Sequence, residues 1–515
     1  MGHSPLKIEQ EHYKVPKKAK TFTWALIGIG LVLSIIGFFT IPRDNGHHNS
    51  NGDDHATVNE NIEVLKAGVQ DEAGQHGDEH QDASSAHGND NSNSGHNDEH
   101  QTTEGEKHAE SHGDIVGYEI GTPIDCGIAG CEDETHNHAA HAEEHHAKPW
   151  YTQVWTALLA NSYYILLISL GGLFFYCVQY VANAGWATTL LRIPQGMYSF
   201  FIIPAAVVML VVFFGGDDMY HWIHYQHLNL SVEDPGFDKI LDGKKWFLNS
   251  TFLFGVVPVC MVVWYIIGMR LKALSKMEEE EGGTKGHFKS IRSSAAFMVI
   301  FGFTFSFLAW LVIMSLDAHW FSTIFGIYHF ATLWVCSLSV IMLITLHLRK
   351  NGYMKTLRED HIHDLGKFMF AFSVFWMYIW VAQYLLIWYA NIPEESMYYT
   401  IRRTNSYDFF FIANVVINFV IPFLLFMTRD GKRNPKIITF VAISILIGHW
   451  IDMYLGIYPG AFNGEVVYPG LLEIGLFLLF AGIFIKWTLN AISKRGIIPI
   501  NHPFIEESAT HDVGV

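Results

Sequence analysis

The sequence has few cysteines and few charged residues for its length. Five cysteines among 515 residues are too few for a disulfide-based scaffold. The chain has no C-x-x-C-H segment to attach a haem and no run of closely spaced cysteines to hold an iron-sulfur cluster. It therefore has no recognisable redox centre. Charged residues make up 16% and hydrophobic residues 50%, a composition that excludes an ordinary soluble or disordered protein and indicates a membrane protein.

The acidic net charge of −17 comes from one segment of the chain. Between Arg43 and Ala147, 24 Asp and Glu face three basic residues, so this segment carries −21 and the rest of the chain +4. No cluster of basic residues typical of nucleic-acid binding is present, and we expect no nucleic-acid partner.

Ten apolar runs are long enough to cross a membrane, because a hydrocarbon core of about 30 Å needs about 20 helical residues. We expect an all-α integral membrane protein with ten transmembrane helices, arranged as two four-helix bundles plus two flanking helices. The runs are 21–41, 157–182, 196–214, 247–268, 295–315, 325–347, 367–390, 409–427, 436–457 and 468–488.

A weak internal repeat supports the two bundles. Pro258 and Pro422 each follow an aromatic pair, Trp246-Phe247 or Phe410-Phe411, at the same spacing, and Ser250 or Asn414 stands eight residues before each proline. We expect both prolines to kink their helices.

Lys and Arg fix the expected orientation, because cytoplasmic loops carry the excess of both. With the N-terminus inside, 24 of the 33 Lys and Arg lie on the cytoplasmic side. We expect a cytoplasmic N-terminus (1–20), a retained membrane anchor (21–41), a periplasmic insert (42–148), a nine-helix transmembrane domain (149–492) and a cytoplasmic tail (493–515).

The insert combines acidic residues with 15 of the chain's 29 histidines. It has little apolar surface to offset the entropy of ordering, so we expect it to be disordered. The histidines are consistent with capture of zinc or another divalent cation, but their irregular spacing favours a solvating tether. If the insert faces an oxidising compartment, Cys126 and Cys131 can form a disulfide.

Ionisable residues gather where the helices are expected to reach the outer membrane surface. Such residues are costly inside a membrane, so each is a candidate site residue. The outgoing helices end in Asp217, Asp218, His221 and His224, in Asp317 and His319, in Glu394 and Glu395, and in His449 and Asp452, while the incoming helices add His329 and Glu473.

His449 and Asp452 are three residues apart and share a helical face, so the carboxylate can orient the ring or take its proton. This arrangement favours proton exchange. For the acids at 217, 218, 394 and 395, simple contact with water is the favoured interpretation.

Near the expected cytoplasmic surface, His361, His363 and Asp364 stand just before the seventh apolar run. They are candidates for proton uptake, although a solvated helix start with Asp364 as its N-cap is the favoured interpretation. Gln383, Asn414 and Asn418 either continue a polar path or link helices by hydrogen bonds.

Three long stretches resemble a known family: SLDAHWFSTIFGIYHFA, DLGKFMFAFSVFWMYIWVAQYLLIWYANIPEE and GHWIDMYLGIYPG. They are similar to the polysulfide-reductase-like (NrfD-type) membrane subunits of alternative complex III, the bacterial quinol:cytochrome c oxidoreductase, and most of all to the subunit called F. The resemblance covers roughly Trp150 to Pro499. It implies a subunit of the bacterial inner membrane with no covalently bound cofactor, in a complex whose substrate is a quinol such as menaquinol. It also implies three partners: an iron-sulfur subunit, a multihaem cytochrome c subunit and a sister NrfD-type subunit.

The residues that match the family's acid and histidine pattern at the outer face are Asp317, His319, His449 and Asp452. We expect this chain to contribute quinone interaction, proton translocation or both, with Trp320 and Trp450 near the quinone ring, and to be inactive alone. One alternative is a structural anchor of the complex without a quinone site of its own. The other is a divalent metal transporter, which the lack of H-x-x-x-D and H-E-x-x-H pairs in the ten runs disfavours. No metal site is expected within the helices.

Overall fold

A computed structural model describes residues 9–43, 148–228, 230–234, 236–403 and 407–512 of the chain. Nearly all of the expected disordered insert, together with its two cysteines, lies outside these residues, as does the side chain of Glu394. Across the described part, the secondary structure is helical and contains no strand, which confirms the all-α prediction.

The longest helices form the membrane domain: α1 (Lys17–Thr40), α4 (Trp150–Val181), α6 (Ile202–Met219), α9 (Ser250–Glu281), α10 (Thr284–Val312), α11 (Phe325–Lys350), α12 (Glu359–Ala390), α16 (Pro435–Ala461) and α17 (Leu471–Ser493). One further span is built from three consecutive pieces, α14 (Tyr407–Val415), the π-helical η3 (Val416–Val420) and α15 (Ile421–Phe426). Short helices connect them: η1 (Gly185–Leu190), α5 (Arg192–Tyr198), α7 (His221–Leu228), α8 (Lys239–Lys244), η2 (Met314–Leu316), α13 (Pro393–Arg403) and α18 (Ile505–Ala509).

Ten of these spans are long and apolar enough to cross a membrane, which confirms the prediction of a multi-pass membrane protein. Several helices are longer than the apolar runs that predicted them. The run at 247–268 becomes α9, which continues to Glu281, and the run at 295–315 becomes α10, which starts at Thr284. The added turns are polar, because a helix that leaves the hydrocarbon core needs no further apolar residues.

Helices α4 and α11 form the centre of the fold. Almost every residue of α4 is buried, in keeping with a sequence that is apolar on all sides. Gly171 of α4 lies against Ser337 of α11, and a Cβ atom at Gly171 would stand 1.9 Å from the Ser337 hydroxyl oxygen. Small residues at this contact allow the two backbones to approach closely.

Helix α1, the predicted anchor, packs along α17 in a similar way. Gly30 and Gly37 of α1 have so little space that a Cβ atom would collide with the backbone at Leu479 or Leu472. Gly475 of α17 fits against Ser34 in return. In contrast, Gly28 faces open space.

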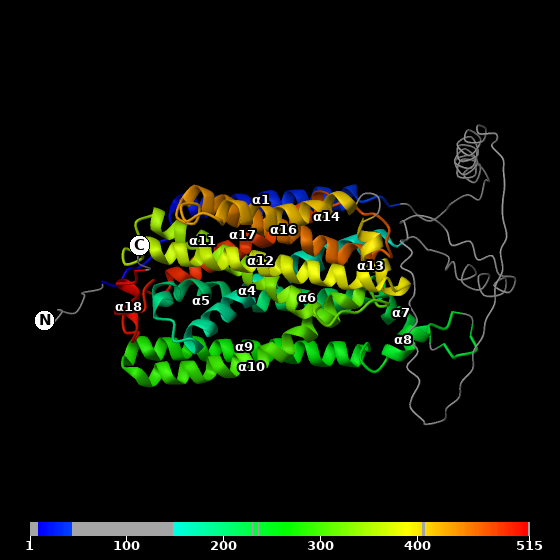
Figure 1. The fold of residues 1–515 in the computed structure, drawn as a ribbon, viewed down its shortest axis with the longest axis horizontal. Helices are drawn as coiled ribbons and strands as arrows, with labels where there is room; N and C mark the ends of the chain where they lie inside the picture. Colours follow the sequence, from blue (N-terminus) through cyan, green and yellow to red (C-terminus); the bar gives the residue numbers. More distant parts are fainter. Residues whose placement is uncertain (1–8, 44–147, 229, 235, 404–406, 513–515) are drawn as a thin grey trace, which may run out of the picture. The chain divides into compact units, whose positions relative to one another are not determined.

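The long helices lie side by side, and α18 stands at one end of them while α7, α8 and α13 stand at the other (Figure 1). We call the end with α18 the terminal end; it comprises 9–16, 182–191, 282–283, 351–358, 428–434 and 494–512. We call the end with α7, α8 and α13 the loop end; it comprises 220–228, 236–249, 317–324, 391–403 and 462–470. At the terminal end the Tyr13 hydroxyl bonds to His347, and the Ile497 amide donates to the Glu11 carbonyl.

The two prolines of the predicted repeat have different local structures. Pro258 leaves α9 continuous, whereas Pro422 directly follows the π-helical turn η3. Ser250 begins α9, but Asn414 is buried within α14 and donates to Asp452. Ser250 and Asn414, the polar residues that match in the sequence repeat, therefore have different contacts in the structure.

Candidate functional site

Asp317 is held at the loop end by a buried arginine. It follows η2, and its Oδ2 accepts a hydrogen bond of 2.7 Å from Nη2 of Arg402 in α13. Arg402 also donates to the carbonyls of Leu455 and Tyr398, both at 2.8 Å, and its guanidinium lies 3.5 Å from the centre of the Tyr398 ring. Burial alone lowers the pKa of Arg402, but the Asp317 carboxylate raises it, and the net pKa is above the ordinary value. Arg402 is therefore a fixed positive charge.

A small cavity of about 30 Å³ lies next to this pair. Arg402 lines one side, and Asp452 and Asn414 line another, with Tyr328 and Gln383 also in its wall. Ligand pockets usually measure about 300 Å³ or more, so this cavity has room for one or two water molecules but none for a quinone ring. It connects the surroundings of the Asp317 pair to Asp452.

Asp452 is the centre of a buried hydrogen-bond chain. The Tyr328 hydroxyl donates to its Oδ1, and Asn414 Nδ2 donates to the same oxygen at 2.9 Å. Asn418, one turn further along, donates to Asn414 at 2.6 Å. Donors from α11 and α14 thus converge on one carboxylate of α16, and η3 joins the chain through Asn414. Its other oxygen, Oδ2, has no hydrogen-bond partner among the described residues.

His449 stands beside this oxygen and is completely buried. Its Nδ1 is 3.8 Å from Asp452 Oδ2, on the same face of α16. Its ring and the Trp376 ring form an edge-to-face pair with ring centres 5.1 Å apart. Neither ring nitrogen, nor the side-chain oxygen of Asn418, has a hydrogen-bond partner in the described part of the chain. Buried polar atoms are nearly always satisfied by protein or by ordered water. This cluster therefore requires water molecules.

His329 of α11 lines the same cavity from another side. Its Nδ1 is 3.2 Å from the Tyr163 hydroxyl, and it is fully buried against Phe325. Together, Asp452, His449 and His329 place three titratable groups in the interior of the helix bundle. Their positions allow proton exchange through water.

His319 does not join this cluster, although it follows Asp317 by two residues. It turns to the opposite side and forms a 2.5 Å hydrogen bond with Asp238, the N-cap of α8. Burial raises the pKa of Asp238, but the hydrogen bonds from His319 and from the amides of Leu241 and Ile240 lower it to about 2. This pair anchors the connection between α7 and α8.

Glu473 also lies apart from the Asp452 cluster and serves a helix start. Its carboxylate accepts hydrogen bonds from the Gly470 amide at 2.7 Å, from Gln153 at 2.8 Å and from the Tyr458 hydroxyl at 3.0 Å. An acidic side chain at a helix N-terminus is favourable because the free amides point toward it. Its partners are complete, so a structural role explains its burial.

The remaining loop-end candidates lie at the periphery. Asp217 is exposed and 3.6 Å from His227, while the carbonyl of Asp218 accepts a hydrogen bond from Lys148. The His221 ring lies 5.9 Å from that of His319. Glu394 belongs to α13, and its side chain lies outside the described residues. The structure brings Asp217, Asp218 and His221 into other contacts, away from the Asp452 cluster.

The predicted aromatic neighbours, Trp320 and Trp450, contact other side chains of the protein. Trp320 stacks on Tyr398 with ring centres 3.8 Å apart, and Trp450 donates from its ring nitrogen to Asn161. The ring nitrogen of Trp320, in contrast to that of Trp450, has no hydrogen-bond partner among the described residues.

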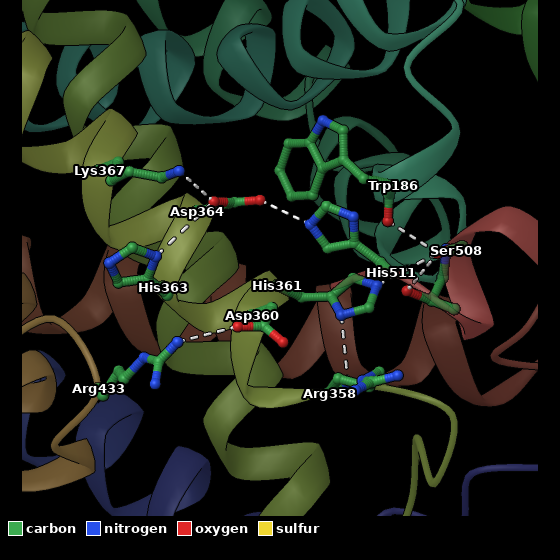
Figure 2. A network of polar contacts seen from close by, with 11 residues as sticks. Trp186, Arg358, Asp360, His361, His363, Asp364, Lys367, Arg433, Ser508 and His511 are labelled. Atoms are coloured by element: carbon green, nitrogen blue, oxygen red, sulfur yellow. Dashed lines mark hydrogen bonds and ion pairs between the residues drawn. The ribbon is translucent and has the colours of Figure 1, made fainter. Parts of the chain in front are cut away.

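At the terminal end, His361, His363 and Asp364 are buried rather than solvated (Figure 2). Helix α12 begins earlier than expected, at Glu359, and its N-cap is Arg358, so the prediction that Asp364 caps a solvated helix start is wrong. The reason is the C-terminal segment, which folds back over the start of α12. There, His511 lies 2.7 Å from Asp364, and Ser508 lies 3.3 Å from His361.

Asp364 is the most connected group of this network. Besides His511 it contacts Lys367 at 2.6 Å and His363 at 3.8 Å, and the neighbouring Asp360 pairs with Arg433 at 3.0 Å. Figure 2 shows the side chains of α12 and of the C-terminal segment pointing toward one another. Ionisable groups from two distant parts of the chain thus form one buried network.

Three important residues were not identified from the sequence. Arg402 lies in a segment expected to be an outer loop, Tyr328 has no distinguishing pattern, and His511 lies in the expected tail. A weak signal existed only for Arg402, because Lys and Arg are scarce on the side expected to be periplasmic.

Comparisons with known proteins do not identify a family. No protein-family model matches this chain, and no curated protein is similar to it at a significant level.

Proposed function

We propose that this chain is a membrane subunit of a bacterial quinol:cytochrome c oxidoreductase of the alternative complex III type, and that its own role is proton transfer. The quinol, the iron-sulfur and multihaem subunits and the sister NrfD-type subunit belong to the proposal through the resemblance of three sequence stretches. The chain itself has no recognisable site for an electron carrier, so oxidation and reduction take place in its partners.

One observation carries the proton-transfer role: the buried pair of His449 and Asp452. A carboxylate and an imidazole placed inside a membrane are costly, and residues in such positions usually serve transport or proton exchange. The unpartnered atoms of this pair require water, and water next to two titratable groups provides a route for protons.

The loop-end geometry suggests how each group acts. Oxidation of a quinol releases two protons and two electrons. A proton that enters the water-sized cavity can protonate Asp452, whose neighbouring His449 can accept it in turn. Arg402, as a fixed positive charge, pairs with Asp317 and lines the cavity that reaches Asp452. Because this cavity is too small for the quinone ring, the ring binds outside it.

The terminal-end network around Asp364 is the second part of the proposed route. On α12, Asp364 and Ser373 lie on the buried side, and apolar Leu365 and Met369 stand between them. Trp376, which contacts His449, stands 12 residues after Asp364, so at 1.5 Å of rise per residue the two networks lie about 18 Å apart along α12. A proton can therefore pass between the two networks only along water molecules, so access of water to this apolar section controls transfer.

The orientation follows from the distribution of Lys and Arg. Most of them lie toward the terminal end, which we assign to the cytoplasm with both chain termini. The loop end and the 42–148 insert then face the periplasm of the inner membrane, where multihaem cytochromes receive electrons.

Isolation of the chain from native membranes tests membership of the complex. An affinity tag at the C-terminus, mild detergent and mass spectrometry are expected to recover iron-sulfur and multihaem subunits in fixed stoichiometry, with quinol:cytochrome c activity. Isolation of the chain alone, from membranes that retain that activity, contradicts the proposal.

Substitutions at the pair test the role of the chain within the complex. His449→Leu and Asp452→Leu are expected to lower quinol oxidation or its coupled proton movement while the complex stays assembled. Asp217→Asn, at an exposed acid, is the matched control and is expected to have no effect. Loss of partner subunits from the two variants, with no specific loss of rate in the complexes that remain, indicates a structural anchor instead.

A further inference from the structure

A second buried cluster, outside the proposed proton route, joins one carboxylate and two imidazoles at the terminal end. Glu278 lies near the end of α9, His287 lies in the first turns of α10, and His502 belongs to the segment that follows α17. All three side chains are at least nine-tenths buried. Their nearest ligand atoms all lie within 4.8 Å of one another.

Glycines in the turn between α9 and α10 bring Glu278 and His287 together. Gly282 and Gly283 have φ angles of +66° and +71°, which other residues rarely adopt, and they reverse the chain between the two helices. Gly286 then packs directly against Glu278, where a Cβ atom would lie 3.1 Å from the Glu278 Cβ. This tight turn fixes His287 Nδ1 at 3.3 Å from Glu278 Oε1.

The cluster leaves several polar atoms without hydrogen bonds. Oε1 of Glu278 and both ring nitrogens of His287 are buried and have no hydrogen-bond partner among the residues that the structure describes. His502 Nε2 points toward the same carboxylate oxygen at 3.9 Å. Buried polar atoms of this kind require a partner, and here the atoms lie close enough together to share one.

We propose that Glu278, His287 and His502 bind one divalent transition-metal ion of the zinc class. Carboxylate oxygen and imidazole nitrogen bind zinc at about 2.0 to 2.2 Å, which places neighbouring ligand atoms of a tetrahedral ion about 3.4 Å apart. The separations of 3.3 and 3.9 Å are close to this value, so the side chains need only small shifts.

The surroundings suit such an ion. The Tyr180 hydroxyl donates to Glu278 Oε2 at 2.9 Å, and a hydrogen bond of this type orients a ligating carboxylate. A cavity of about 10 Å³, lined by Glu278, His502, Tyr176 and Tyr180, has room for about one water molecule as the fourth ligand. Arg192, the nearest cation in this cavity, is neutralised by Glu279 at 2.6 Å.

Binding requires one change of tautomer. In the structure the Phe504 amide donates to His502 Nδ1, so the proton of the neutral ring is on Nε2. An ion at Nε2 takes the place of this proton, and the single proton of the neutral ring moves to Nδ1, with Thr188 Oγ1 3.5 Å away as its acceptor. The Phe504 amide loses its partner, which makes it a local reporter of metal binding.

The ion would join parts of the chain that lie far apart in sequence. Figure 1 shows α9 and α10 as neighbouring helices at one edge of the drawn bundle. The metal would fasten their connecting turn to residues 499–504 of the C-terminal segment, close to where α18 covers the start of α12. The proposed site is thus structural and independent of the proposed proton route.

Zinc retention tests the site in the full-length protein. The purified protein is loaded with ZnCl2 and then dialysed against a chelator of moderate affinity, which removes any ions held loosely by the histidines at 47–146. We expect the wild-type protein to retain about one equivalent more than Glu278→Gln and His287→Asn. His224→Ala, at an exposed histidine of α7, is the control and should retain the wild-type amount. Equal retention in all four proteins overturns the proposal.

Hydrogen exchange on the wild-type protein provides a second test that needs no variant. With zinc bound, amides at 278–287 should exchange at least tenfold more slowly, while the Phe504 amide is released from its ring acceptor and exchanges faster. Unchanged exchange at these positions in zinc-loaded and chelator-treated protein means that Glu278 and the two histidines form only a buried ion pair, and the metal site is then rejected.

Discussion

The contact between Asp317 and Arg402 gives the most quantitative prediction. Replacing Asp317 by Asn keeps the size of the side chain but removes its charge, which leaves the Arg402 guanidinium, only 3% exposed, without a counter-ion. Removal of one partner from a buried ion pair costs about 3 to 5 kcal/mol. Because the Asp317 side chain is 15% exposed and water can reach it, we expect the lower limit, about 3 kcal/mol.

The reverse substitution, Arg402→Met, should cost less. It leaves Asp317 without its donor, but this carboxylate stands near the loop-end surface and can be hydrated, so we expect about 2 kcal/mol. The double variant removes both charges, and buried pairs replaced by neutral residues are often nearly as stable as the original. We therefore expect the double variant to lose much less than the sum of the two single variants, with a coupling energy of at least about 2 kcal/mol.

Reversible unfolding in mixed micelles measures these values. The four proteins are titrated with a denaturing detergent, and helix content is followed by circular dichroism. The reasoning is refuted if the double variant loses as much free energy of unfolding as the two single variants together, within about 0.5 kcal/mol. Independent sites behave in that way.

Three further predictions follow from other contacts. Gly475→Leu should separate α1 from α17 and expose α1 to protease, whereas Gly28→Leu, where a side chain meets open space, should leave digestion unchanged. The depressed pKa of Asp238 stabilises the loop end at pH values above about 4, and this contribution is lost as the pH falls through about 2. His319→Ala should shift this loss to higher pH, which the thermal midpoint measured as a function of acid pH will show. An unchanged pH profile in the variant contradicts the prediction. Cys126 and Cys131 lie in the insert that the proposed orientation puts outside, so both are first replaced by Ser. In that variant, Ser322→Cys should react with a membrane-impermeant thiol reagent in intact cells, and labelling only after lysis would reverse the proposed orientation.

The sequence predicted the helices well because the physical signal is local. About 20 consecutive apolar residues are needed to cross the hydrocarbon core, and this length can be read directly from the chain. In the same way, the three-residue spacing of His449 and Asp452 sufficed to predict a shared face, since helix geometry determines it.

Contacts between distant segments could not be predicted in this way. Asp317 and His319 are near neighbours in sequence, yet one contacts Arg402 and the other Asp238, because the chain turns between them. The burial of Asp364 depends on His511, which belongs to a segment with no apolar run to place it. Similarly, Glu278 and His502 meet only because the C-terminal segment returns to the α9–α10 turn.

The central claim is that Asp452 carries protons during quinol oxidation, and the proton-to-electron ratio of the complex tests it most directly. The purified complex is reconstituted in liposomes, and proton release and cytochrome c reduction are recorded together for the wild-type protein and for Asp452→Asn, which has the same shape but cannot ionise. We predict a ratio at least one half lower in the variant, with all subunits present. A wild-type ratio at wild-type turnover in the fully assembled Asp452→Asn complex would contradict the account.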